Sequence, residues 1–292
     1  MAKRGRNQNS SDPERPKRAT DYAQVLARVF DKHKLPGASE FPFPRSALLE
    51  AASEVGVSLP KNIGDVVYSH RYRTDAPDAI AMHEPEGKEW VVFGAGKSKY
   101  RFVLVKKVRI TANAALQPIK IPDATPEIIR EYALNDEQAL LAKIRYNRLI
   151  DLFLGVVAYP LQSHLRTSVK EIGQIEIDEL YVGVNRRGAH FVVPVQAKTA
   201  NDRVGIVQVW QDMQLCRAHD KFKHMVARPV GAQVFEDAEG NEVIALFELQ
   251  VDGYDLALVE EMQYRLVPWN TIEKAELDEY RATEHRDSGR VG

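Results

Sequence analysis

The stretch GQIEIDELYVGVNRRGAHFVVPVQAK, residues 173–198, gives the clearest prediction of the fold. Two runs rich in β-branched and aromatic residues, at about 174–183 and 189–198, flank the turn-forming sequence NRRG. This pattern predicts two strands joined as a hairpin. Both runs are as apolar as covered strands, yet polar residues interrupt them at every second place. These residues are Glu176, Asp178, Gln196 and Lys198.

Alternation of side chains across a strand sorts these residues by face. On the first strand it sets Glu176 and Asp178 against Ile175, Ile177 and Tyr181. On the second strand it sets Gln196 and Lys198 against Val193, Val195 and Ala197. Pairing through the turn would then bring four polar groups together at one end of the sheet.

This convergence has two explanations. A cross-strand ion pair between Asp178 and Lys198 on an exposed face would contribute only about 0.2–1 kcal/mol. In a poorly hydrated place, an unpaired charge would instead cost several kcal/mol. The second explanation is a site for a hard divalent cation, because Mg²⁺ accepts carboxylate and amide oxygens together with waters and phosphate oxygens. A lysine beside such an ion can orient or help deprotonate an attacking water.

The sequence around this hairpin predicts a domain over residues 125–272. Helical periodicity over residues 136–157 predicts one long core helix, and residues 204–219 predict another. Apolar runs at 230–237, 242–250 and 261–268 predict further strands. The fold class expected for this domain is therefore an α/β sandwich with a central mixed sheet.

The preceding block, residues 21–115, has a different pattern. Residues 21–33 predict a helix. A second helix would be capped by Ser46 and ended by Gly56, with a third following Pro60. The core positions expected on these two helices are Leu48, Leu49, Ala52, Val55, Ile63, Val66 and Val67. Two β-rich runs around Gly94 and Gly96 then predict a hairpin.

Helix, helix-turn-helix and hairpin in this order resemble a winged helix. Such a domain would present a basic surface to the phosphates of DNA. The residues expected on it are Arg71, Arg73, Lys97, Lys99 and Arg101. Winged helices also serve as protein-protein modules, so this alternative stays open. The GAGKS sequence at 94–98 is not a phosphate-binding loop, because Val91 stands where that motif has glycine.

The two ends of the chain are polar. Residues 1–20 carry six Lys or Arg against two acids and lack apolar periodicity, which predicts a disordered basic arm that either touches DNA or aids solubility. Residues 273–292 predict a fraying tail. The single cysteine, Cys216, excludes an internal disulfide and a cysteine zinc cluster. Without a long apolar run, the sequence predicts no membrane association and a cytoplasmic location.

The motif IEIDELYVGV…VPVQAK, behind an initial helix, resembles the core of the PD-(D/E)xK nucleases. The resemblance covers approximately residues 136–215, and the whole chain is similar to type II restriction endonucleases. It implies that Asp178 is the strand acid and metal ligand, that Gln196 fills the acid place of the tripeptide, and that Lys198 is the catalytic lysine. Ile177 replaces proline at a position without chemistry. Gln196 matters more, since an amide oxygen brings no charge.

Metal affinity should therefore drop unless another carboxylate compensates for Gln196. Glu176, as a further metal ligand, and Asp151 are the two candidates from the sequence. His164 could assist or be a hydrogen-bonded structural histidine. Gln208 and Gln211, on the following helix, could approach phosphates or form its wet side.

The activity implied is Mg²⁺-dependent hydrolysis of phosphodiester bonds in double-stranded DNA, in restriction or defence, by a homodimer. Two alternatives are a structure-specific repair or recombination nuclease and a noncatalytic DNA-binding regulator.

Overall fold

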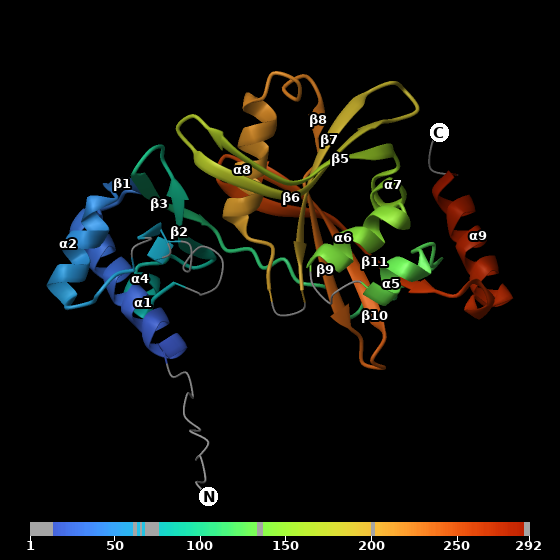
Figure 1. Cartoon of the computed structure of the whole chain (residues 1–292), viewed down its shortest axis with the longest axis horizontal. Coiled ribbons are helices and arrows are strands. Elements are labelled where there is room, and N and C mark those ends of the chain that lie inside the picture. The colour runs from blue at the N-terminus through green and yellow to red at the C-terminus, as the bar shows by residue number, and fades with distance from the viewer. Residues whose placement is uncertain are drawn as a thin grey trace, which may run out of the picture. The chain divides into compact units, whose positions relative to one another are not determined.

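A computed structural model describes residues 14–60, 63–64, 66–67, 76–132, 137–199 and 202–288. The chain divides into two compact units, residues 1–107 and 108–292 (Figure 1). The sequence placed this boundary between 115 and 125. It lies earlier because a strand within the expected linker joins the sheet of the second unit. Among the described residues, no helix has the length and apolar character needed to cross a bilayer.

The first unit combines helices with a small antiparallel sheet. Its elements are α1 (Glu14–His33), β1 (Glu40–Pro44), α2 (Ser46–Val55), α4 (Asp78–Ala81), β2 (Lys88–Gly94) and β3 (Lys99–Lys106). The strand order is β1-β3-β2. The predicted hairpin is confirmed as β2 and β3, and Lys97 lies in the turn between them. β1 was missed because two of its five residues are prolines, which only an edge strand accommodates.

Several details of this unit differ from the sequence expectations. α1 begins at Glu14, so residues 14–20 of the expected arm are helical. Ser46 is the first residue of α2 rather than its cap, and Leu49 is exposed while Leu48 is buried. Gly56 ends α2 with a φ of 72°, as expected. Val66 and Val67 are buried as predicted.

The second unit is built on a large curled mixed sheet. Its strands are β4 (Ile119–Pro122), β5 (Val157–Val169), β6 (Gly173–Val184), β7 (His190–Lys198), β8 (Val226–Ala227), β9 (Val230–Glu236), β10 (Glu242–Asp252) and β11 (Asp255–Val267). Its helices are α5 (Glu127–Tyr132), α6 (Glu137–Tyr146), α7 (Leu149–Leu154), α8 (Ile206–Ala218) and α9 (Lys274–Ser288), with a 3₁₀ turn at Trp269–Thr271. The described strands form the order β4-β11-β10-β9-β7-β6-β5, and β8 also pairs with β7.

The predicted hairpin 173–198 is confirmed as the antiparallel pair β6 and β7 near the middle of this sheet. The chain then passes through α8 and returns as β9, which is parallel to β7. α6 and α7 pack on one face, in a core that includes Tyr181 and Val195. α8 packs on the other face against Ile175 and Ile177. Both faces are thus covered, which explains the apolar character of the two strands.

The single helix predicted over residues 136–157 is wrong. The segment forms α6 and α7, which are separated because Arg148 adopts a left-handed φ of 51°. The Asn147 side chain fixes this junction by donating to the carbonyl of Lys143 and to Thr125 Oγ1, both at 2.9 Å. β5 was also missed, because most of this edge strand is exposed and its side chains show a sustained alternation in burial only over residues 165–169.

The expected tail at 273–292 is largely the helix α9. The backbone N–H of Lys120 in β4 donates to the Tyr280 hydroxyl at 3.1 Å. The Lys120 ammonium also pairs with Glu276 at 2.7 Å. These contacts hold the helix against the edge of the sheet, and they depend on a strand more than 150 residues earlier.

Gly183 in β6 lies too close to β5 for a larger residue. A Cβ at this position would meet the carbonyl oxygen of Val157 at 2.8 Å, and backbone atoms cannot move aside as a side chain would. We therefore expect Gly183→Ala to lower the free energy of unfolding by about 1–3 kcal/mol in urea titrations. Ser168→Ala, at an exposed position of β5, is the control and should change it by less than about 0.5 kcal/mol. Equal effects of the two variants would contradict the close approach.

Candidate functional site

The pairing of β6 with β7 stops at the predicted site. Its last backbone pair is Glu179 with Val195. Beyond it, the N–H of Ala197 donates to Asp178 Oδ2 at 2.9 Å. A side-chain carboxylate thus takes the place of a backbone acceptor, so the two strands part and hold Asp178 between them.

Strand β6 also changes face at Asp178. Ile177 packs in the core under α8, whereas Glu179 accepts hydrogen bonds from Arg145 of α6. Regular alternation would set residues 177 and 179 on the same face. The prediction that Tyr181 shares a face with Ile175 and Ile177 is therefore wrong, because the switch carries Tyr181 to the α6 side.

Asp178 and Lys198 converge as the sequence predicted. Lys198 Nζ lies 3.9 Å from Asp178 Oδ2. Both residues are only 9% exposed, so this is not the exposed surface ion pair that was the simpler explanation. Lys198 Nζ also donates to Glu137 Oε1 of α6 at 3.2 Å. Two carboxylates therefore share one buried ammonium group.

Gln196 is buried beside a further acid. Its Nε2 donates to the carbonyl of Glu176 at 3.1 Å and to Asp212 Oδ2 of α8 at 2.9 Å. These two acceptors fix the orientation of the amide. Gln196 Oε1 and Asp212 Oδ1 are buried and have no hydrogen-bond partner among the described residues. Buried acceptors in this state are costly unless a donor or a cation meets them.

The pKa values of the site carboxyls are raised. Burial raises the pKa of Asp178 and of Glu137, and the nearby Lys198 ammonium opposes the shift in both. Burial also raises the pKa of Asp212 well above the usual value for aspartate. A cluster of carboxyl groups whose pKa values are raised by burial is typical of functional sites and also occurs in structural networks.

The carboxylates proposed to compensate for Gln196, those of Glu176 and Asp151, are both paired with arginines. The Glu176 carboxylate pairs with Arg166 at 2.8 Å, and its side chain is 48% exposed. The Asp151 carboxylate accepts from the N–H of Ala158 at 3.0 Å and pairs with Arg148. Of the glutamines on α8, Gln211 is buried and donates to the carbonyl of Gln174 at 3.4 Å.

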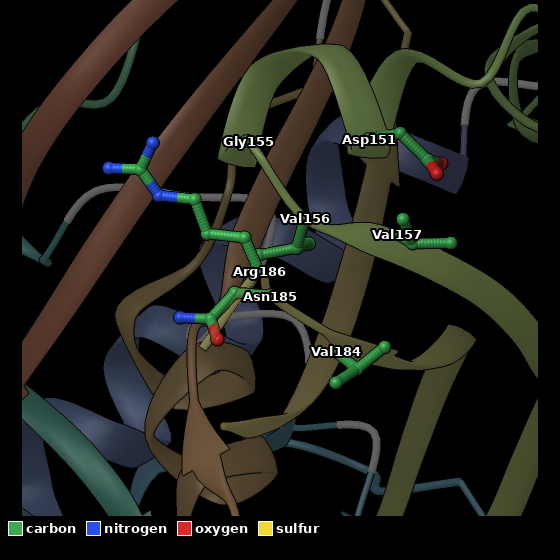
Figure 2. A pocket seen from close by; sticks show the side chains of 7 residues that line it. All are labelled: Asp151, Gly155, Val156, Val157, Val184, Asn185 and Arg186. Atoms are coloured by element: carbon green, nitrogen blue, oxygen red, sulfur yellow. The ribbon is translucent and has the colours of Figure 1, made fainter. Parts of the chain in front are cut away.

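A surface hollow lies at the other end of β6 (Figure 2). It is lined by Asp151, Gly155, Val156, Val157, Val184, Asn185 and Arg186. The Asp151 and Arg186 side chains point apart from each other, and the lining between them is largely apolar. Val184 is six residues beyond Asp178, roughly 20 Å along the strand. The hollow is therefore separate from the polar cluster.

The predicted DNA-binding residues are only partly described. Lys97 and Lys99 are exposed on the hairpin of β2 and β3. Arg101 of β3 is partly buried and pairs with Glu40 at 3.2 Å. Arg71 and Arg73 lie outside the described residues.

Sequence reasoning missed Glu137 and Asp212. Glu137 stands at the start of a helix, where acids are common because they favour the helix dipole. Asp212 carried a better signal, because it is the lone acid in a helix whose other residues are mostly apolar. The buried neighbours in that helix are Val207, Val209, Trp210, Gln211, Met213, Leu215 and Cys216.

The atoms of the cluster can be tested against a divalent cation. No group of three or more His, Cys, Asp or Glu residues in the described part of the chain is arranged to hold a metal. The cluster nevertheless offers carboxylate oxygens and a buried amide oxygen that lacks a donor. These are the hard ligands that suit Mg²⁺, which also keeps several waters. The donor set therefore fits Mg²⁺ in chemical type.

Comparison with known proteins adds no relative. The chain matches no family model, no curated protein and no solved structure.

Proposed function

We propose that this protein is a Mg²⁺-dependent endonuclease that hydrolyses phosphodiester bonds in double-stranded DNA. The observation that carries the proposal is the buried meeting of Asp178 and Lys198 where β6 and β7 part. If only the stability of the fold mattered, apolar residues would serve as well as or better than such a buried charged pair. The order of helix, acid-bearing strand and Gln-x-Lys strand supports the resemblance to PD-(D/E)xK nucleases.

Each residue of the cluster then has a role. Asp178 and Gln196 would supply oxygen ligands to Mg²⁺, and Glu137 is close enough to Lys198 to contribute to the same charge balance. When bound, Mg²⁺ supplies Lewis-acid stabilisation and lowers the pKa of a water. Lys198 has three N–H donors and can orient the attacking water or a phosphate oxygen. The position of the Lys198 ammonium group is fixed, because Glu137 and Asp178 both pair with it.

Asp212 is the acid that best compensates for Gln196. It is 1% exposed and in direct contact with the amide, whereas the carboxylates of Glu176 and Asp151 are paired with arginines elsewhere. Burial disfavours the charged form of this carboxyl, but a cation bound beside Gln196 would favour it and so supply the negative charge that the Gln-x-Lys tripeptide lacks. In this assignment, Gln196 of β7 supplies the oxygen ligand and Asp212 of α8 supplies the charge that one acidic residue provides in the usual tripeptide.

The first unit supports a role in holding DNA. Its order of helix, strand, helices and hairpin is compatible with a winged helix, and Lys97 and Lys99 are exposed at the hairpin. We propose that this unit provides duplex recognition and that the protein acts as a homodimer in the cytoplasm, in defence against foreign DNA.

The first test is digestion of plasmid and phage DNA. We expect cleavage with Mg²⁺ and none after chelation by EDTA, because the cluster lacks enough fixed positive charge to stabilise the transition state alone. Defined ends would favour restriction over structure-specific repair. Binding to duplex DNA without any cleavage would instead support the noncatalytic regulator and contradict the proposed activity.

A further inference from the structure

His164 has an unusual backbone within β5. Its φ is 49°, in the left-handed region that residues other than glycine rarely adopt. The other non-glycine residues of positive φ in the described chain are Ser98, Arg148 and Glu171, which lie outside strands. Such a conformation costs free energy and persists only where the surroundings impose it, often at functional sites.

The unusual backbone lies directly across from Asp178. β5 pairs Ser163 with Glu179 and Leu165 with Ile177, so residues 164 and 178 occupy facing positions. β5 changes face here just as β6 does. Ser163 Oγ accepts from Arg145 of α6 at 3.2 Å, whereas Leu165 packs in the core under α8. One distortion therefore runs through both strands and is centred on His164 and Asp178.

The His164 side chain has no visible structural task. It is exposed, and its imidazole makes no hydrogen bond with another residue in the described ranges. Burial raises the pKa of Asp178, Lys198 opposes that shift, and a positive charge at His164 would oppose it more weakly. Because the imidazole has no hydrogen-bond partner in the described ranges, a structural role does not explain why His164 occupies this position.

We propose that His164 donates an N–H to a nonbridging oxygen of the DNA backbone beside the phosphate that is cleaved. This inference rests on the proposed nuclease function and adds a substrate-binding residue to it. An imidazole has at least one N–H donor in either protonation state, so the contact does not require a charged histidine. The strained backbone would be retained because it lies at the position of the edge strand β5 that faces Asp178 of β6.

The test measures duplex DNA binding in a Lys198→Ala background with Mg²⁺, where the DNA stays uncut. Adding His164→Gly should raise the Kd about tenfold or more, since a hydrogen bond to a charged group is lost. The same change should leave the melting temperature unaltered or raise it, because glycine tolerates this φ. His164→Asn tolerates the backbone and keeps N–H donors, so it should retain most of the affinity.

Glu171→Gly is the matched control. It relieves a left-handed φ of 67° in the turn between β5 and β6, and loss of an acid cannot weaken attraction to DNA. Weakened binding by His164→Gly alone would support the inference. If His164→Gly binds like its parent, the inference is wrong while the nuclease proposal stands. If the parent does not bind DNA and the wild type does not cut it, both fall.

Discussion

Lys198→Ala is expected to reduce DNA cleavage by about 10²–10⁴-fold, the contribution typical of a positioned proton-transfer group. DNA binding should be preserved, because Lys198 is buried beside Glu137 and Asp178 and the exposed lysines of the first unit are untouched. Single-turnover cleavage and a binding titration on the same duplex measure the two effects separately.

Lys143→Ala is the matched control for this variant. Lys143 lies on the same helix as Glu137 and forms an ion pair with Glu242 at 2.6 Å. Its removal should cost no more than about 1 kcal/mol of stability and leave cleavage intact. Cutting by Lys198→Ala at the wild-type rate would remove the basis of the nuclease assignment.

The second large effect concerns the pair formed by Gln196 and Asp212. Gln196→Glu would set two buried carboxyl groups in contact where a 2.9 Å hydrogen bond now lies. We expect the free energy of unfolding to fall by about 3 kcal/mol or more, since Asp212 loses its hydrogen-bond donor and a second acidic group is buried beside it. Urea titrations near neutral pH measure this loss.

Adding Asp212→Asn to Gln196→Glu should restore the hydrogen bond with donor and acceptor exchanged between the two positions. The asparagine amide can donate to the new glutamate, so stability should return to within about 1 kcal/mol of wild type. The carboxylate then stands in the tripeptide itself. We expect a larger rise in melting temperature on Mg²⁺ addition than in Asp212→Asn alone, which lacks the acid altogether.

Two results would count against this exchange. If Gln196→Glu is as stable as wild type, the two side chains do not form the buried contact. If the double variant is stable but shows no more response to Mg²⁺ than Asp212→Asn, the pair is structural and takes no part in holding a cation.

Local pattern was sufficient for the hairpin 173–198. The apolar runs and the NRRG turn predicted β6 and β7 almost to the residue, because a strand covered on both faces needs such a composition. The helix end at Gly56 and the hairpin of β2 and β3 were also predictable from local sequence. Both contain glycines at places where the chain must turn.

The two strands, and through their hairpin the approach of Asp178 to Lys198, could be predicted from the sequence, because a hairpin is a local structure. The identity of the acids that join them depends on the packing of distant helices. Glu137 and Asp212 come from helices on opposite faces of the sheet, and their contacts span 61 and 16 residues. Long-range packing also produced the face switch at Asp178, since a side-chain carboxylate there replaces a backbone acceptor. No local periodicity carries that information.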